Sequence, residues 1–191
     1  VLCAFEAADG FTLHGQLWRP SETPPHTTLP INAATGVAAR YYSRYAAYLA
    51  CHGFLVLTYD YRGIGASRPA SLRNLRATKH DWGALDCDAA IQTLHQQAPE
   101  LPMMAVCHSI GGFALGLAPS ARCIQRAFFV GCQYAYWQDY RPLVRLPMWL
   151  NWHLIMPVLT RIFGYFPGKR LGWLEDLPSG VAMEWATRFH P

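Results

Sequence analysis

A serine at the end of a short apolar run is the residue best suited to chemistry in this sequence. Residues 103–108 are mostly apolar, Ser109 follows them, and Gly111 and Gly112 lead into small apolar residues. The pattern predicts a buried strand, a sharp turn at the serine and then a helix. In such a turn the hydroxyl stands clear of the sheet, and glycines are needed because strand and helix almost touch. A hydroxyl held in this way can attack a carbonyl carbon.

The match to the usual G-x-S-x-G pattern is partial, because Cys107 stands at the position of its first glycine. An ordinary strand-to-helix turn of an α/β protein is therefore the alternative interpretation of Ser109. Its place after a buried strand and before a helix of small residues favours the nucleophile. Adjacent residues of such a turn point in different directions, so we expect His108 to pack beside the strand and not to act as a base.

A nucleophilic serine also needs donors for the negative charge that develops on the substrate oxygen. The backbone amide of Ile110 begins the helix after the turn and would face that charge. A second amide should come from the loop after the predicted strand 27–32, where residues 35–37 stand. Gly36 lets the backbone approach closely, and Val37 is the predicted second donor.

Apolar runs and periodicity predict the elements that would position these residues. Predicted strands cover residues 2–6, 11–18, 27–32, 54–59, 103–108 and 126–130, and predicted helices cover residues 38–52, 81–98 and 110–117. Asp9-Gly10 predicts a hairpin between the first two strands, and the unbroken apolar run 54–59 suits a strand buried on both faces. Asp86 falls in the early part of helix 81–98, where a carboxylate suits the helix dipole. The alternation of strands and helices predicts an α/β layer architecture.

The composition changes after Gly131. Residues 133–168 are rich in tryptophan, tyrosine, proline and methionine, and no further run resembles a buried parallel strand. We predict a pair of amphipathic helices broken near Pro157 and a further helical stretch over residues 173–191, folded over the sheet as a cap. His153, Pro157 and Arg161 argue against a membrane span in residues 148–166. The predicted division is a core over residues 1–131 and a helical cap over residues 132–191.

The totals indicate a globular domain. The 191 residues are 52% hydrophobic, with a net charge of +4. Six cysteines without a Cys-x-x-Cys pair favour free thiols and a reducing compartment, so the predicted location is cytoplasmic. A local basic excess between Arg68 and Lys79 has no interleaved aromatic residues, so nucleic acid is not an expected partner.

No cofactor is predicted. No spacing of His, Cys, Asp or Glu residues suggests a zinc site, and no other metal site is expected. Gly63-Ile64-Gly65 resembles the start of a dinucleotide fingerprint, but Arg68 stands where its third glycine is needed.

The order of hairpin, Ala-Thr-Gly loop, Asp60-Tyr-Arg-Gly-Ile-Gly-Ala-Ser67 loop, Asp81-Trp82 helix and Cys107-His-Ser-Ile-Gly-Gly112 turn resembles the α/β-hydrolase superfamily. The chain is most similar to bacterial esterase-like members near the serine aminopeptidase and monoglyceride lipase group. The resemblance implies a mostly parallel sheet with an N-terminal antiparallel hairpin, helices on both faces and an inserted helical cap. It also implies a Ser-Asp-His triad in that chain order, with the acid after a strand beyond the cap and the histidine in a loop after the last strand.

The residues after Ser109 offer few partners for such a triad. Of the later histidines, His153 lies in the predicted cap, and His190 is next to last with no strand before it. Asp139, Glu175 and Asp176 are expected to be solvated residues of helix ends or loops. The triad acid and histidine are therefore expected beyond residue 191.

The sequence thus leads to two hypotheses. The first is a serine hydrolase that cleaves a carboxylic ester or related acyl bond of a small apolar substrate through an acyl-enzyme on Ser109, with Ile110, Val37 and Gly36 forming the oxyanion hole. The second is a binding or interaction module of the same fold without turnover, which Cys107 and the apolar predicted cap would suit.

Overall fold

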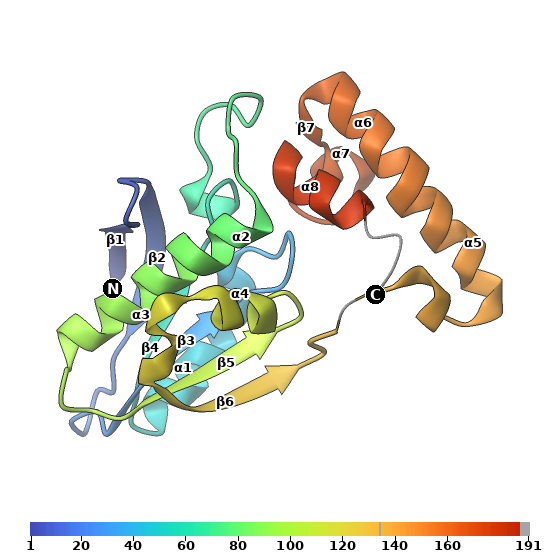
Figure 1. Ribbon diagram of the computed structural model, residues 1–191. Coiled ribbons are helices and arrows are strands. Elements are labelled where there is room, and N and C mark those ends of the chain that lie inside the picture. The colour runs from blue at the N-terminus through green and yellow to red at the C-terminus, as the bar shows by residue number, and fades with distance from the viewer. Residues whose placement is uncertain (134, 188–191) are drawn as a thin grey trace.

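A six-stranded sheet forms the centre of the protein. The computed structural model describes residues 1–133 and 135–187. The strand order is β1-β2-β4-β3-β5-β6 (Figure 1). The strands are β1 (Leu2–Glu6), β2 (Thr12–Trp18), β3 (Thr27–Asn32), β4 (Phe54–Tyr59), β5 (Met103–His108) and β6 (Ile124–Val130). β1 and β2 form the predicted antiparallel hairpin, β2 is antiparallel to β4, and the remaining neighbours are parallel. The predicted fold class is confirmed.

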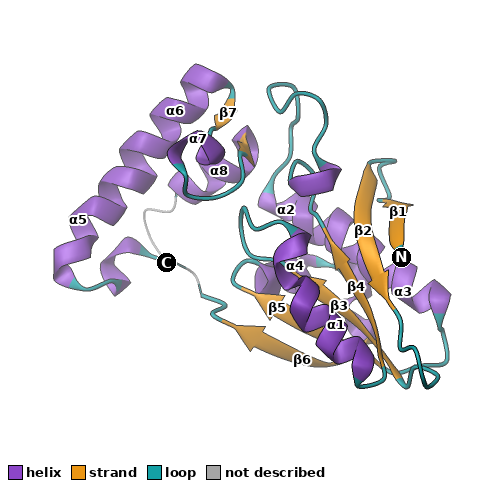
Figure 2. Cartoon of the chain, turned by 180° about the vertical axis from the view of Figure 1, so that it is seen from behind, coloured by secondary structure: helices purple, strands orange, loops and turns teal. Residues whose placement is uncertain are grey.

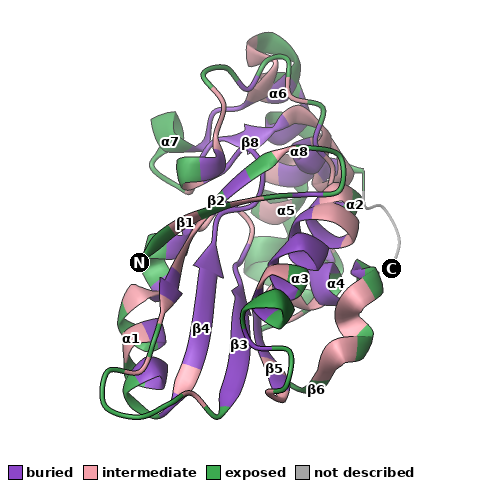
Figure 3. Ribbon diagram, turned by 90° about the vertical axis from the view of Figure 1, so that its left-hand side faces the viewer, coloured by how far each residue is buried: buried purple, intermediate pink, exposed green. Residues whose placement is uncertain are grey.

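Helices cover both faces of this sheet, because each parallel connection crosses over one face. Helix α1 (Ser43–Cys51) lies on one face, and α3 (Asp88–Gln97) and α4 (Gly111–Leu117) lie on the other (Figures 1 and 2). Every residue of β3 is buried, and β4 is buried from Leu55 onward, as their continuous apolar runs require (Figure 3).

The helix predicted over residues 81–98 begins slightly earlier than expected. The side chain of Thr78 and that of Asp81 form a capping box around the short helix α2 (Lys79–Asp81). A π-helical segment, η3 (Trp82–Cys87), then leads into α3. The predicted apolar face is confirmed, since Cys87, Ile91 and Leu94 are fully buried.

Strand β6 differs from its predicted environment. We expected a buried strand, but Phe128 is 62% exposed, Phe129 54% and Val130 42%. β6 is the last strand of the described sheet, with β5 as its neighbour on one side only. The apolar sequence was sufficient to predict a strand, but burial also requires a neighbour on the second edge and over the faces.

Residues 137–187 form a mostly helical region that we call the C-terminal helical region. It contains η5 (Trp137–Asp139), α5 (Pro142–Leu150), a π-helical segment η6 (Asn151–Ile155), α6 (Met156–Phe163), β7 (Tyr165–Phe166), α7 (Gly168–Leu171), β8 (Leu177–Pro178) and α8 (Ser179–Ala186). Trp152, Met156, Phe166 and Val181 from this region belong to the same apolar cluster as the sheet. The region is also joined to the core by a hydrogen bond of 2.6 Å from the Lys79 amide to Glu184.

The helical rod in this region is longer than predicted. α5, η6 and α6 run without interruption over residues 142–163, so the predicted break near Pro157 is wrong. Proline lacks the N–H that an α-helix would use at this position, and the π-helical turn directly before it changes the local hydrogen-bond pattern. The helix predicted over residues 173–191 is confirmed only as α8, and the residues after Thr187 lie outside the described part. Within residues 1–133 and 135–187, no helix has both the length and the apolar character that a membrane crossing requires.

Candidate active site

Ser109 occupies the turn between β5 and α4. Its backbone φ is +54°, in the left-handed region that few residues other than glycine adopt. The Ser109 amide donates to the carbonyl of Val130 over 3.0 Å, which fixes the turn to the end of β6. The Ser109 hydroxyl makes no hydrogen bond to any of the described residues. Ser109 therefore has the backbone geometry of a nucleophile elbow and an available hydroxyl.

The two glycines after the serine are required by close approaches. A Cβ atom on Gly111 would collide with the backbone carbonyl of Asn32 at the end of β3. A Cβ atom on Gly112 would lie 2.9 Å from the sulfur of Cys132. The spacing of Gly111 and Gly112 thus follows from the contact of α4 with the ends of neighbouring strands.

The additional side chain of Cys107 fits beside the elbow without entering it. Cys107 is fully buried, and the side-chain amide of Asn32 donates to its sulfur over 3.5 Å. The hydroxyl of Tyr59 donates in turn to Oδ1 of Asn32 over 2.8 Å. Burial raises the pKa of the Cys107 thiol to about 12, so this thiol stays neutral and is a poor nucleophile at neutral pH.

Two backbone amides near the elbow are open. The N–H of Ile110, directly before α4, makes no hydrogen bond to a described residue, and neither does the N–H of Thr35. The N–H of Val37 instead donates to the carbonyl of Ala34 over 3.1 Å and closes a turn. The loop after β3 therefore presents Thr35, and not only the predicted Val37, as a source of a second amide.

Tyr42 connects this loop to the elbow. Its hydroxyl accepts a hydrogen bond from the Ala34 amide over 2.9 Å and lies 2.9 Å from Nδ1 of His108. The Tyr42 and His108 rings also meet edge to face. Burial raises the pKa of Tyr42 to about 12, so its hydroxyl stays protonated. No feature of the sequence marks Tyr42 for this role, because it stands among several other tyrosines.

Gly36 is held against the C-terminal helical region. Its φ is +68°, and its carbonyl accepts a hydrogen bond of 2.9 Å from the Glu175 amide. A Cβ atom on Gly36 would lie 2.7 Å from Cδ1 of Leu174. The loop that presents Thr35 is therefore in direct contact with residues 174–175.

The loop from Asp60 to Ser67 is structural. The Asp60 carboxylate accepts hydrogen bonds from the amides of Ala39 (2.7 Å) and Ala66 (2.9 Å), and burial raises its pKa. The Ser67 hydroxyl donates to the Asp60 carbonyl over 2.7 Å. A Cβ atom on Gly65 would collide with the Asp60 carboxylate, and one on Gly63 would collide with the side chain of Pro178.

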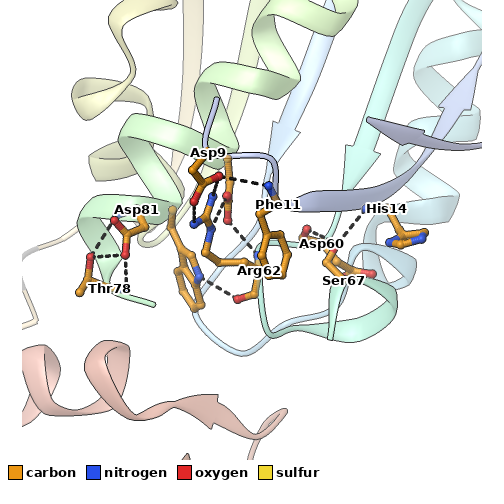
Figure 4. A network of polar contacts seen from close by, with 10 residues as sticks. Asp9, Phe11, His14, Asp60, Arg62, Ser67, Thr78 and Asp81 are labelled. Carbon is orange, nitrogen blue, oxygen red and sulfur yellow. Dashed lines mark hydrogen bonds and ion pairs between the residues drawn. The ribbon is translucent and has the colours of Figure 1, made fainter. Parts of the chain in front are cut away.

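Arg62 lies at the centre of the network in Figure 4. Its Nε donates to the fully buried Asp86 over 2.7 Å, and its two terminal nitrogens donate to Asp9 over 2.6 and 3.1 Å. The indole nitrogen of Trp82 donates to the Arg62 carbonyl over 3.1 Å. The interpretation of Asp86 as a helix-dipole carboxylate was incomplete, since its main partner is a buried arginine.

The predicted solvation of two acidic residues in the C-terminal helical region is wrong. Glu175 is 8% exposed and is paired with Arg40 at 3.2 Å and with Lys169 at 2.6 Å. Asp176 is 6% exposed and is paired with Arg68 at 2.7 Å. Both carboxylates thus hold the C-terminal helical region to the core, and their core partners Arg40 and Arg68 are 135 and 108 positions away, too far to be recognised from the sequence.

The other candidate acid and base residues do not reach Ser109 within the described residues. Asp139 is exposed in η5. Nδ1 of His153 is 2.7 Å from the carbonyl of Ala186, within the C-terminal helical region. His190 lies outside the described residues.

The described residues contain neither a disulfide bond nor a cluster of metal-binding side chains. All six cysteines are free thiols, as predicted. No group of three or more His, Cys, Asp or Glu side chains in residues 1–133 and 135–187 is arranged to hold a metal ion.

Solved structures share this fold at low sequence identity. A soluble variant of monoglyceride lipase from Saccharomyces cerevisiae, in complex with a substrate analog, aligns with a TM-score of 0.65 and 17% identity, covering 96% of this chain and 68% of that one. A cold-adapted esterase from an Arctic intertidal metagenomic library (TM-score 0.53, 20% identity) is covered over 58% of its length, with 67% of this chain aligned. A thermostable carboxyl esterase from Bacillus coagulans (TM-score 0.56, 14% identity) is covered over 55%, with 91% of this chain aligned. The chain therefore spans less than two thirds of the length of these two esterases.

No curated protein sequence matches the chain. A family model described as serine aminopeptidase, S33, matches residues 29–177, which contain most of β3, the Asp60–Ser67 loop, the elbow and most of the C-terminal helical region. Because this match covers well over half of the sequence, the chain belongs to the serine aminopeptidase S33 family of α/β hydrolases.

Proposed function

We propose that the chain carries the nucleophile of a serine hydrolase that cleaves carboxylic esters of small apolar substrates. The observation that carries this proposal is the left-handed backbone of Ser109, which holds an available hydroxyl beside the open amide of Ile110. The esterases and the lipase with the same fold support an ester as the substrate class.

In the proposed mechanism, Ser109 Oγ attacks the ester carbonyl carbon and its proton passes to a histidine. The carbonyl oxygen becomes an oxyanion, which accepts hydrogen bonds from the Ile110 amide and from an amide of the loop after β3. The Thr35 amide is open to this role, whereas the Val37 amide would first have to leave the carbonyl of Ala34. Collapse of the intermediate expels the alcohol with the proton from the histidine. Water then releases the acid from Ser109.

We propose that the histidine and its acid are supplied by residues after 191. The support is the uncovered outer part of the sheet, where Phe128 and Phe129 are more than half exposed. Gly112, Phe113, Leu117 and Phe129 line an open apolar hollow between α4 and β6. Additional strands and helices of the same polypeptide would bury these side chains. Without the histidine, hydrolysis should be slower by roughly 10⁶-fold, because triad members act as a unit.

The C-terminal helical region is the proposed cap over residues 132–191. The support is its contact with the loop after β3, through Leu174 and Glu175, next to the amides of the proposed oxyanion hole. Its aromatic residues supply apolar surface for the acyl group, and Trp137 and Trp149 are not fully buried by the described residues.

A fluorophosphonate probe on the full-length protein tests the proposal, since it labels only an activated serine. We expect labelling of the parent protein, labelling of a Ser21→Ala control and none of Ser109→Ala. Ser21 is a suitable control because it is an exposed serine in the loop after β2. Folded full-length protein without any labelling would overturn the proposal and favour the binding module without turnover.

A further inference from the structure

One side of the helical rod α5–η6–α6 is covered with exposed apolar side chains. Leu143 is 93% exposed, Leu146 63%, Leu154 52%, Val158 43% and Ile162 68%. We call these five residues the outer face. Large apolar side chains of this kind are common singly on protein surfaces, but a contiguous set marks an interaction site.

The outer face points away from the rest of the C-terminal helical region. Trp152, Met156 and Thr160 are buried at four-residue spacing, and the rod packs this side toward α8 (Figure 1). Leu154 and Val158 each follow a buried residue by two positions, which turns them by about 200° around the helix axis. They therefore lie opposite the side that α8 covers. The rod forms the outer margin of the molecule in Figures 1 and 2.

The exposed charges near the rod are mostly basic, although Asp139 is exposed in η5 directly before α5 and Lys169 pairs with Glu175. Residues 140–174 contain no Asp or Glu, and their charged residues are Arg141, Arg145, Arg161, Lys169 and Arg170. All five are exposed. A helix with an exposed apolar surface, basic residues and a tryptophan, here the 38% exposed Trp149, has the composition of an interfacial helix. Basic residues near an anionic bilayer add electrostatic attraction to it.

We propose that the outer face binds peripherally to the surface of an anionic lipid bilayer, with its apolar side chains at the level of the headgroups. The excess of exposed basic residues over exposed acidic ones in residues 137–174 favours an anionic bilayer over a typical protein partner, whose rim would offer charges of both signs. This binding does not need the Ser109 hydroxyl, so it is independent of the proposed catalytic activity.

Cosedimentation with vesicles tests the proposal on full-length Ser109→Ala protein, which cannot hydrolyse an ester on Ser109. We expect binding to vesicles of phosphatidylcholine mixed with phosphatidylglycerol, and weaker binding to vesicles of phosphatidylcholine alone. Added salt should weaken the binding, because it screens the arginines.

Two substitutions examine the outer face itself. Leu143→Glu combined with Ile162→Glu should reduce binding to the mixed vesicles by about tenfold or more. The substitutions remove apolar area that would be buried in the bilayer and add negative charges that the anionic lipid repels. The matched control is Tyr48→Glu, because Tyr48 is 59% exposed on α1 and lies outside the rod. Circular dichroism and urea unfolding of each variant show whether it is folded.

Several results would overturn the proposal. These are no binding of folded protein to mixed vesicles, binding that the double variant retains, and an equal loss in the Tyr48→Glu control. A double variant that cannot fold would show that the outer face is packed within the complete protein. A dimer that the double variant dissolves, without vesicle binding by the parent, would assign the face to a second copy of the chain.

Discussion

The hydroxyl oxygen of Tyr42 lies 2.9 Å from Nδ1 of His108, the residue before the elbow serine. The same oxygen accepts a hydrogen bond from the Ala34 amide in the loop after β3. One side chain therefore sets the spacing between the loop that presents Thr35 and the turn that presents Ser109. Both parts of the proposed oxyanion hole depend on this contact.

Replacement of Tyr42 by phenylalanine should destabilise the protein by about 1–3 kcal/mol, because the buried Ala34 amide loses its acceptor. Urea unfolding measures this change. Tyr41→Phe is the control, since Tyr41 is 73% exposed, and we expect it to stay within about 0.5 kcal/mol of the parent. Equal effects of the two substitutions would contradict the assigned role of Tyr42.

Two glycines of α4 should respond in opposite directions to the same substitution. Gly111→Ala should destabilise the protein by about 1–3 kcal/mol or more, because the new methyl group meets the carbonyl of Asn32. Gly116→Ala should stabilise it by up to about 1 kcal/mol, because no atom lies within 4 Å of a Cβ there and alanine favours a helix. Thermal unfolding of both variants compares them. A destabilised Gly116→Ala protein would mean that α4 is packed differently from the description above.

Arg62→Met should be among the most destabilising substitutions of a charged residue in this chain. It leaves the fully buried Asp86 carboxylate without its ion-pair partner, at a cost of about 3–5 kcal/mol. Arg40→Met removes a pair in which the arginine side chain is 78% exposed, so its cost should be under about 1 kcal/mol. Denaturant titrations of the two proteins would refute this expectation if they gave similar free energies of unfolding.

The pair of Asp9 with Arg62 should make stability depend on pH in the acid range. The hydrogen bond from Arg62 lowers the pKa of Asp9 below its usual 3.8. The stabilisation is therefore complete above pH 3.8 and is lost as the pH falls through the lower folded value. Asp9→Asn should be less stable than the parent by up to about 1 kcal/mol at pH 7, since Asp9 is partly exposed, and the difference should shrink toward zero as the pH falls below the lowered pKa of Asp9. A difference that is constant across this range would contradict the ion pair.

Much of the sheet and the elbow could be predicted from the sequence, because their signals are local. The apolar run of β4 shows that the strand is buried, and the pair Gly111-Gly112 shows that the backbone is closely approached at this turn. Both features can be recognised from a few consecutive residues. The burial of β6 could not be predicted in this way. An apolar run shows what a strand needs, but its exposure depends on which elements lie beside it.

Long-range polar contacts were the main part of the site that the sequence did not reveal. Tyr42 and His108 are 66 positions apart, and Arg68 and Asp176 are 108 apart. Neither pair has a spacing that marks it, and Tyr42 sits among several tyrosines of the same helical stretch. Only the parallel alignment of strand ends brings Tyr42 near His108.

The left-handed backbone of Ser109 also has a consequence for stability. A residue with a Cβ atom in this region costs the folded chain roughly 1–2 kcal/mol compared with a right-handed conformation, and glycine avoids most of that cost. Ser109→Gly should therefore relieve strain in the turn while removing the hydroxyl. The backbone conformation that exposes the proposed nucleophile is thus also one that lowers the stability of the folded chain.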